Sequence, residues 1–326
     1  MSRIPHVRGG PYAPPVPAHE LTAVSADGAR IHVEVHGAEN APAVVLVHGW
    51  TCSTAFWAAQ IRALSATYRV IAYDQRGHGR TEAPLEPAGY GTRALADDLE
   101  AVLAATLAPG EGAVLVGHSM GGMTLMAAAG RPGVREHAAA VLLCSTGSSR
   151  LVAESTVVPL RAGALRTRLT RRVLGARAPL GPVTPLAKRA LKYATMGPGS
   201  APERVDVCAR IVHACPRVVR YRWAHVLDEL HLDAGVGELA VPTAVIAGTA
   251  DRMTPVAHAR RIAAALPHCL GLTELTGVGH MTPVEAPEVV TRRIAELAET
   301  YVVRERARGL NRVPGREFSE REREGA

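Results

Sequence analysis

The sequence has few aromatic residues and lacks any long apolar run. Aromatic side chains make up 4% of its 326 residues, and only two of them are Phe. No stretch approaches the roughly eighteen uninterrupted apolar residues of a membrane-spanning helix. The proline-containing segment 1–20 has no apolar core of the signal-peptide type and is expected to form an extended arm. These absences favour a globular protein of the cytoplasm.

Cysteine is also scarce and shows no paired spacing. The chain has five cysteines, an odd number, and no CxxC pair, which is typical of free thiols in the cytoplasm. Cys208, His213 and Cys215 lie close in sequence, but no second pair of ligands accompanies them. A phosphate-binding G-x-x-x-x-G-K-[ST] loop is absent too. We therefore expect neither a metal ion nor a cofactor.

Positive charge is in excess, with a formal net charge of +7. A basic chain invites a nucleic-acid partner, because the phosphate backbone dominates such binding. The scarcity of aromatic residues and the absence of an RNA- or DNA-binding motif speak against it. We expect no nucleic-acid partner.

Short apolar runs define the fold class. Residues 21–37 read as two strands joined by an Asp27-Gly28 turn, an antiparallel hairpin. Six later runs are apolar almost continuously, which is typical of strands buried on both faces of a parallel sheet. These runs cover residues 43–49, 68–74, 112–119, 139–145, 242–248 and 270–276. With helical patterns between them, they predict an α/β fold with eight strands, mostly parallel, and helices on both faces.

The alternation of strands and helices is interrupted once. Residues 149–236 have helical patterns punctuated by Pro and Gly, and they are expected to form an inserted helical cap. The core is then made of residues 21–148 and 237–303. The tail, 304–326, mixes seven arginines with five glutamates and few apolar residues, so we expect it to be disordered.

The stretch 114–123, VLVGHSMGGM, is a strand followed by a sharp turn and a helix. Gly117 and Gly121 flank Ser119 in the pattern G-x-S-x-G, which places a strained serine at the tip of such a turn. The serine then sits at a helix N-terminus, where backbone N–H groups favour developing negative charge. Ser119 is the predicted nucleophile, provided that a base and an acid can be found for it.

The base and the acid follow in the chain order that this motif requires. Asp251 comes in a loop directly after the apolar run 242–248, and the end of the run before it offers no carboxylate. His280 follows the last run, 29 residues after Asp251, and is flanked by Gly279. A loop histidine in this position is not explained by core packing. We therefore predict that His280 activates Ser119 and that Asp251 orients His280.

Two backbone N–H groups are needed to hold an oxyanion. Met120 follows the nucleophile and supplies the first. Trp50 follows His48-Gly49 at the end of the first apolar run and is the predicted second donor. His48 is interpreted as a structural hydrogen-bonding residue. Trp50 and Trp57 are interpreted as core residues, with lining of the pocket as the alternative for the side chain of Trp50.

These motifs resemble those of the α/β-hydrolase superfamily, and within it the capped esterase, lipase and haloperoxidase-like branch. The matching pieces are HGW, YDQRGHGRT, GHSMGG, GTADRMTP and GVGHMTPVEAPE, spread over residues 43–300. The resemblance implies that Asp74, Arg76, Gly77 and Gly79 shape a loop beside the active site without taking part in the chemistry. Relatives that open epoxides or remove halogens carry Asp at the nucleophile position, so Ser119 disfavours those reactions.

The sequence thus predicts a serine hydrolase that cleaves a small hydrophobic carboxylic ester or thioester through an acyl-enzyme on Ser119. One alternative uses the same triad for perhydrolysis, as haloperoxidase-like proteins do, or for C–C bond hydrolysis. An alternative of another class is a ligand receptor or interaction protein that keeps the fold without catalysis. The oligomeric state stays open.

The predicted cap is strongly basic. Residues 155–202 contain nine Lys or Arg and no Asp or Glu. They form either a solvated helix face or a cationic amphipathic lid that contacts an anionic membrane. Some of the cap's apolar residues are expected to face Ser119 and line an acyl or alcohol site, while the arginines face outward. These apolar residues are Leu160, Leu165, Leu169, Leu174, Leu180, Leu186, Leu191 and Met196.

Overall fold

The computed structural model describes residues 10 and 12–304. Eight strands form one sheet in the order β1-β2-β4-β3-β5-β6-β7-β8. β2 runs antiparallel to β1 and β4, and the remaining neighbours are parallel. The mostly parallel eight-stranded sheet predicted from the sequence is confirmed. The strands are β1 (His19–Val24), β2 (Arg30–His36), β3 (Ala43–Val47), β4 (Arg69–Tyr73), β5 (Ala113–His118), β6 (Ala138–Cys144), β7 (Thr243–Gly248) and β8 (Cys269–Leu275).

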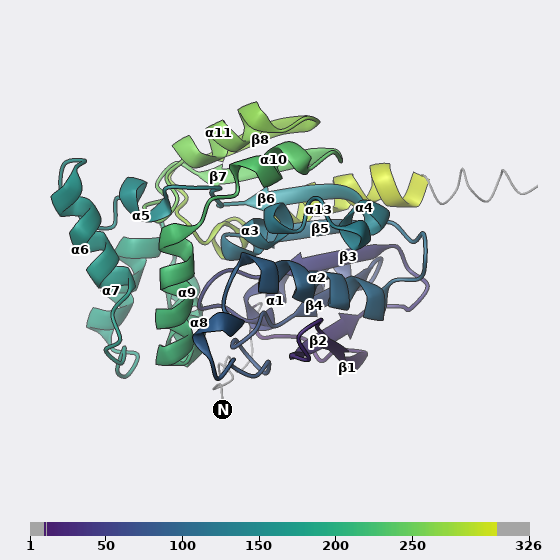
Figure 1. The fold of residues 1–326 in the computed structure, drawn as a ribbon, viewed down its shortest axis with the longest axis horizontal. Helices are drawn as coiled ribbons and strands as arrows, with labels where there is room; N and C mark the ends of the chain where they lie inside the picture. The colour runs from purple at the N-terminus through teal and green to yellow at the C-terminus, as the bar shows by residue number, and fades with distance from the viewer. Residues whose placement is uncertain (1–9, 11, 305–326) are drawn as a thin grey trace, which may run out of the picture.

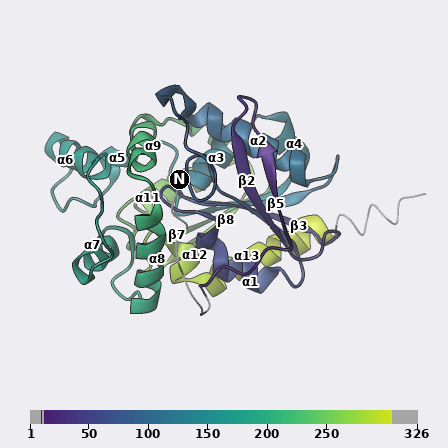
Figure 2. The same cartoon turned by 90° about the horizontal axis from the view of Figure 1, so that it is seen from below.

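Helices cover both faces of the sheet (Figures 1 and 2). Alternate residues of β3 enter different cores, with Val45 and Val47 on one side and Val44 and Leu46 on the other. This two-sided burial explains why the central strands are continuously apolar. One face carries α2 (Thr92–Thr106), α3 (Met120–Ala127) and α4 (Pro132–His137). The other carries α1 (Ala58–Leu64), α12 (Thr282–Glu285) and α13 (Pro287–Ala298).

Two sequence-based expectations are wrong at the ends of the sheet. β8 was expected to be buried on both faces, but it is an edge strand with most of its side chains exposed. Its Glu274 forms an ion pair with Arg260 of α11 (Ala257–Ala265) at the surface, which suits an edge position. The N-terminal arm was expected to reach residue 20, but β1 begins at His19 and pairs with β2. The first nine residues and the tail from 305 lie outside the described residues.

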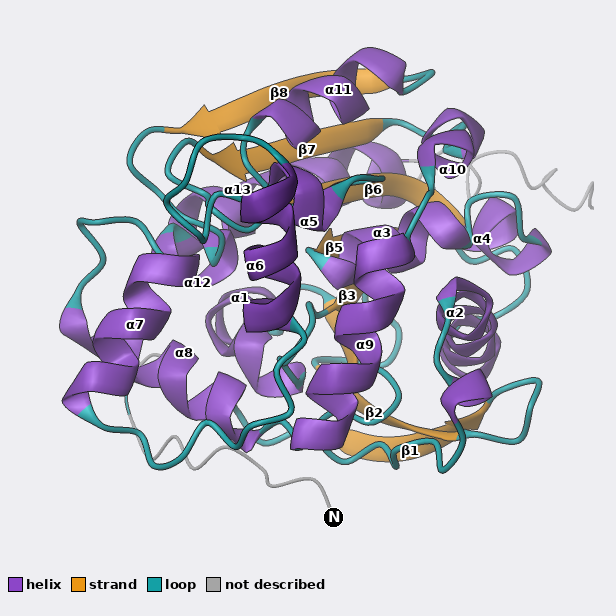
Figure 3. Cartoon of the chain, turned by 60° about the vertical axis from the view of Figure 1, so that its left-hand side comes forward, coloured by secondary structure: helices purple, strands orange, loops and turns teal. Residues whose placement is uncertain are grey.

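Between β6 and β7 the chain forms a run of helices. They are α5 (Leu151–Glu154), α6 (Ala164–Leu174), α7 (Pro185–Thr195), α8 (Pro202–Ala214), α9 (Arg217–Glu229) and α10 (Asp233–Glu238). Figure 1 shows α6 to α9 together at the left side of the sheet, and the view of Figure 3 brings them to the front. We call residues 151–229 the helical segment. The division into core and cap at residues 149 and 236 stays a prediction.

The loop after β4 is built around buried charge. The Arg76 side chain is almost fully buried, and its guanidinium pairs with Asp98 of α2 and with Asp27 of the β1–β2 turn. The Asp74 carboxylate accepts hydrogen bonds from the backbone N–H groups of Thr54 and Arg80 at 2.8 Å each. A Cβ at Gly79 would lie 2.2 Å from that carboxylate, so only glycine fits there. The loop has the structural character that the family resemblance implies.

Candidate active site

Ser119 lies at the turn between β5 and α3 with a strained backbone. Its φ of 52° and ψ of −117° put it in the region that non-glycine residues rarely adopt. The turn is tight because the backbone of α3 lies close to the backbone of neighbouring segments of the same chain. A Cβ at Gly121 would lie 2.0 Å from the carbonyl oxygen of Val47, and one at Gly117 would lie 2.5 Å from the Gly122 nitrogen. Both glycines of G-x-S-x-G are therefore required by close backbone approach.

His280 and Asp251 form a hydrogen-bonded chain with Ser119. The Oγ of Ser119 lies 3.0 Å from Nε2 of His280, and Nδ1 of His280 lies 2.8 Å from Oδ2 of Asp251. All three side chains are largely buried. A proton on Nδ1 satisfies Asp251 and leaves the lone pair of Nε2 facing the serine hydroxyl. The structure brings the three predicted residues together from loops that follow three different strands.

The Asp251 carboxylate is fixed by its own loop. Its Oδ1 accepts hydrogen bonds from the N–H groups of Met253, at 2.8 Å, and Thr254, at 2.9 Å. The Thr254 hydroxyl lies 2.9 Å from Oδ2 and 3.1 Å from the carbonyl oxygen of Ser145. These contacts hold Asp251 in place and leave Oδ2 directed at His280. Thr254 was not among the residues predicted from the sequence, although its place three residues after the acid is a local signal for such a loop.

The backbone of His280 is held on both sides. Its N–H donates to the carbonyl oxygen of Thr195 at 2.8 Å, at the end of α7. Its carbonyl oxygen lies 2.8 Å from Nε2 of His118, the residue before the serine. Burial lowers the pKa of His118 well below its ordinary value, so this imidazole is neutral and donates from Nε2. The ring of His118 also packs near those of Phe56 and His280, whose centroids are 4.6 and 5.0 Å away.

Glu285 links the His280 loop to the helical segment. Its Oε2 accepts hydrogen bonds from the N–H of Gly197 at 2.7 Å and of Gly279 at 3.2 Å, and from the hydroxyl of Ser200 at 2.5 Å. Its Oε1 accepts from the N–H of Met281 at 3.1 Å. One buried carboxylate therefore joins the loop after α7 to both residues that flank His280. No local sequence pattern identifies this role, because the donors come from positions up to 88 residues away.

The two N–H groups predicted to hold an oxyanion lie at the ends of β3 and β5. In the described part of the chain, the amide N–H groups of Trp50 and Met120 donate no hydrogen bond. Gly49 packs directly on the turn between β5 and α3, which we call the serine elbow, since a Cβ at Gly49 would lie 3.1 Å from Cβ of Ser119. The next amide, that of Thr51, already donates to Nε2 of His78 at 3.2 Å. The N–H of Trp50, unlike that of Thr51, thus stays available.

His48 holds the same loop from within. Burial is the main reason that its pKa falls to about 3, so the ring is neutral. Its Nε2 accepts a hydrogen bond from the N–H of Gln75 at 3.0 Å, and its Nδ1 donates to the carbonyl oxygen of Gly49 at 2.8 Å. This is the structural role predicted for His48 from the sequence. Trp57 is fully buried in the core, also as expected.

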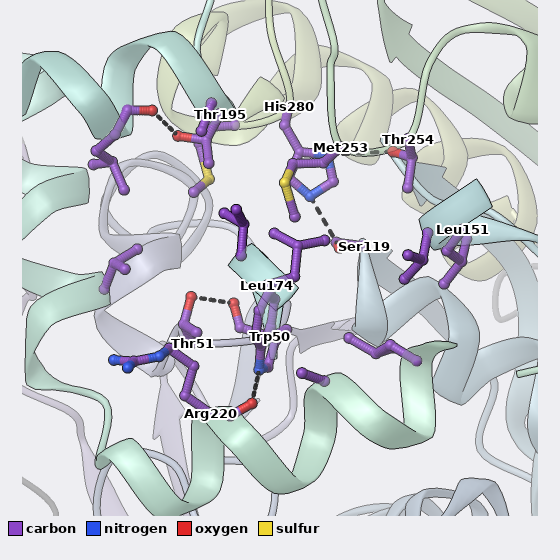
Figure 4. Close-up of a pocket in the computed structure, with 18 of the residues that line it drawn as sticks. Trp50, Thr51, Ser119, Leu151, Leu174, Thr195, Arg220, Met253, Thr254 and His280 are labelled. Carbon is purple, nitrogen blue, oxygen red and sulfur yellow. Dashed lines mark hydrogen bonds between the residues drawn. The ribbon is translucent and has the colours of Figure 1, made fainter. Parts of the chain in front are cut away.

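A cavity of about 190 Å³ lies over Ser119 and His280 (Figure 4). Trp50 forms part of its wall and is anchored by a hydrogen bond from Nε1 to the carbonyl oxygen of Arg220 at 3.1 Å. Apolar side chains of the helical segment provide much of the remaining lining. They are Leu151, Val152, Val173, Leu174, Leu180, Leu191, Ala194, Val212, Ala224 and Leu227.

The expectation that apolar residues of the cap line the site holds for three of the eight residues. Leu174, Leu180 and Leu191 line the cavity. Met196 is buried in the core that contains α13, and Leu169 does not contribute to the lining. The other three leucines of the set, Leu160, Leu165 and Leu186, are exposed. The arginines of the basic stretch 155–202 face outward as expected, apart from a half-buried Arg166 that donates to the carbonyl oxygen of Ala153.

One group of described side chains has the composition of a metal site. Ligand atoms of Glu20, His32 and Glu34, on β1 and β2, lie within 4.8 Å of one another. Glu20 is already paired with Arg80, which brings a positive charge to the same place. The group shares no residue with the cavity over Ser119.

A family model for the alpha/beta hydrolase fold matches residues 42–287. The chain belongs to the α/β-hydrolase fold family. The match spans the serine elbow, the Asp251 loop, the His280 loop and the helical segment between them. In the described residues, no helix is both long enough and apolar enough to cross a membrane.

Individual relatives agree with the family. A putative carbamate hydrolase, RutD, from Variovorax paradoxus (strain S110) is 48% identical over 94 residues, which are 28% of this chain and 34% of that protein. The chain therefore spans only about a third of the length of that relative. The esterase RhEst1 from Rhodococcus sp. ECU1013 has a similar structure over 86% of this chain and 99% of its own, with 26% identity and a TM-score of 0.71. A bromoperoxidase from Bacillus anthracis, at 21% identity, shares the fold over 86% of this chain and 100% of its own, with a TM-score of 0.72.

The hydrogen bonds of Glu285 lead to a prediction on stability. In Glu285→Gln the side-chain NH₂ cannot accept a hydrogen bond, so at least one of the buried donors around it loses its partner. We expect the free energy of unfolding, measured by urea denaturation, to fall by about 1–3 kcal/mol. Glu288→Gln, at an exposed position of α13, serves as the control and should change it by less than about 0.5 kcal/mol. Equal stability of the two variants would contradict the role given to Glu285.

Proposed function

We propose that the protein is a serine hydrolase that cleaves a hydrophobic carboxylic ester, or a thioester, through an acyl-enzyme on Ser119. The observation that carries the proposal is the chain of hydrogen bonds from Ser119 through His280 to Asp251 at the base of an apolar cavity. A serine hydroxyl is a weak nucleophile without a base, and this arrangement supplies one. The similarity to the esterase RhEst1 supports the same reaction class.

The proposed reaction has two halves. The Ser119 oxygen attacks the ester carbonyl carbon while His280 Nε2 takes the hydroxyl proton, and Asp251 stabilises the imidazolium. The carbonyl oxygen becomes an oxyanion that accepts hydrogen bonds from the N–H groups of Trp50 and Met120. His280 then gives its proton to the leaving alcohol, and the acyl group stays on Ser119. Water, deprotonated by His280, attacks this acyl-enzyme and releases the acid and the free serine.

Covalent labelling tests the nucleophile. A fluorophosphonate probe should label the wild-type protein and fail to label Ser119→Ala, because the phosphonyl group is transferred to the activated oxygen.

Asp251→Asn should still fold but lose on the order of 10⁴-fold in turnover, since the imidazole then loses its orienting carboxylate. Asp74→Asn is the matched control for a buried carboxylate outside the chain of hydrogen bonds. Undiminished labelling of Ser119→Ala, or an Asp251→Asn loss below tenfold, would overturn the assignment.

The apolar lining predicts a dependence on acyl-chain length. Each methylene that leaves water for the cavity contributes about 0.8 kcal/mol, which is roughly fourfold in rate if it is expressed in the transition state. We expect kcat/KM for 4-nitrophenyl esters to rise from acetate to hexanoate and then level off as the cavity of about 190 Å³ fills. A flat profile would argue against an apolar acyl site.

We further propose that the helical segment contacts an anionic lipid surface. Of eleven large apolar side chains exposed in the described residues, seven belong to this segment. They are Leu160, Leu165, Val173, Leu180, Leu186, Tyr193 and Val218. Arg161, Arg168, Arg172 and Arg189 are exposed on the same segment, and none of the ion pairs between described residues involves them. Exposed leucines beside unpaired arginines are typical of surfaces that enter an anionic membrane interface. Val173 and Leu180 also line the cavity, so its mouth opens on this surface.

Vesicle sedimentation tests the contact. The wild type should bind vesicles that contain phosphatidylserine, bind neutral phosphatidylcholine vesicles weakly, and be released by salt. Leu165→Ser combined with Leu186→Ser should weaken binding about tenfold or more, because two exposed leucines lose their insertion into the interface. Leu85→Ser removes a still more exposed leucine outside the segment and is the control. If binding is absent, or if both variants bind alike, the basic surface is a solvated face.

A further inference from the structure

Arg220 has an unusual position among the residues around the cavity. It lies in the first turn of α9, its side chain is buried with 7% of the residue exposed, and it lines the cavity together with Ser119. Arg220 and Leu180 also line a second, outer hollow of about 440 Å³ between the end of α8 and the start of α9. Arg220 therefore stands where the cavity over Ser119 adjoins a separate space.

The Arg220 guanidinium has no carboxylate partner among the described residues. Its Nη2 donates to the carbonyl oxygens of Ala176, at 3.2 Å, and Ala178. Its Nε and Nη1 make no hydrogen bond within the described part of the chain, and neither is sealed off from the adjoining space. Burial lowers the pKa of this guanidinium. Burying a guanidinium charge is unfavourable unless a group of opposite charge pairs with it.

Arg76, the other buried arginine among the described residues, shows how such a charge can be paired within the protein. Arg76 is also almost fully buried, but two carboxylates, Asp98 and Asp27, surround its guanidinium. Even the exposed Arg171 on the neighbouring helix α6 pairs with Asp228. Arg220 differs from both because, within residues 10 and 12–304, its guanidinium hydrogen-bonds only to two neutral carbonyl groups. Beside Arg76, protein carboxylates pair with the guanidinium. Beside Arg220, the corresponding position is free for the carboxylate of a ligand.

The space beyond Arg220 is electropositive. Arg217 and His213 line the outer hollow with Arg220, and the lining contains no Asp or Glu. A further hollow of about 390 Å³ shares Arg217 and is lined by Arg177 and Arg222, again without a carboxylate. Converging cations in a recess raise the local concentration of anionic ligands. The lining is thus apolar next to Ser119 and basic further out.

We propose that Arg220 binds a carboxylate of the substrate, so that the ester cleaved at Ser119 carries a negatively charged end separated from the scissile bond by an apolar chain. The inference rests on the proposed serine hydrolase function and narrows its substrate class to esters with a carboxylate. A single buried guanidinium matches the single charge of a carboxylate, and the N–H groups on Nε and Nη1 are its donors. Arg217, at the exposed rim, attracts the same group electrostatically.

Matched pairs of substrates test the proposal. The first pair is the mono-4-nitrophenyl ester of hexanedioic acid and its terminal carboxamide, which place the group on the acyl side. The second pair is the butanoate ester of 4-hydroxybutanoate and of 4-hydroxybutanamide, which place it on the alcohol side. In at least one pair, wild-type kcat/KM should favour the acid over the amide by about tenfold or more, through a lower KM, because a charge-assisted hydrogen bond replaces a neutral one.

Variants then locate the preference. Arg220→Gln should bring the ratio of kcat/KM for acid over amide close to one, and the ratio corrects for any general loss of activity. Because Arg220 also holds the backbone at Ala176 and Ala178, Arg217→Gln provides a second variant that leaves those bonds intact and should reduce the ratio several-fold. Arg292→Gln removes one exposed positive charge on α13 and should leave the ratio unchanged.

The outcomes separate this inference from the proposed function. If the amides are hydrolysed through Ser119 but neither pair shows a preference for the acid, the role of Arg220 is wrong and the hydrolase proposal stands. The same holds if the preference persists in both Arg220→Gln and Arg217→Gln. If no ester of either pair is hydrolysed and the fluorophosphonate probe leaves Ser119 unlabelled, the proposed function itself is wrong.

Discussion

The left-handed backbone of Ser119 is the constraint on which the site depends. A serine with a φ of 52° is held at the tip of the turn only because the chain on either side is packed too tightly to relax. A Cβ on Gly121 would collide with the backbone of Val47, and a Cβ on Gly49 would press on the side chain of Ser119 itself. The same tight packing therefore brings the ends of β3 and β5 together. The two N–H groups proposed as oxyanion donors lie at these strand ends as a consequence of the strained turn.

The helical segment and the His280 loop are built as one unit. His280 donates its N–H to the end of α7, and Glu285 joins the next turn of the segment to both neighbours of His280. The backbones of Gly197 and Gly279 approach so closely that a Cβ on Gly279 would lie 2.4 Å from the Gly197 nitrogen. A movement of α7 therefore acts on the imidazole through short, direct contacts. The segment that shapes the cavity also sets the position of the proposed base.

Local sequence patterns predict the sheet and the chemistry of the site, whereas long-range packing escapes them. The strands are continuous apolar runs, and the elbow needs glycine at fixed spacing, so both leave a signal within a few residues. Asp251 and His280 each follow the end of a strand, in the chain order serine, acid, histidine that the motif requires, so their positions can be predicted from the sequence. Glu285 leaves no such signal, because its four donors are spread over the sequence. For the same reason, spacing alone does not separate Leu174 and Leu191, which line the cavity, from Leu165 and Leu186, which face outward.

Two buried arginines show how the fold handles charge in different ways. The guanidinium of Arg76 forms ion pairs with Asp98 and Asp27, so it links the loop after β4 to α2 and to the β1–β2 turn. Arg220 is left with neutral carbonyl partners beside the cavity. Since desolvating a guanidinium is unfavourable, retaining it at an otherwise apolar wall is explained best by an anion that arrives with the substrate. An apolar wall binds any chain of suitable length, and the buried cation adds the selectivity that the wall lacks. The proposed substrate, an apolar chain with a carboxylate at its far end, satisfies both parts of the cavity at once.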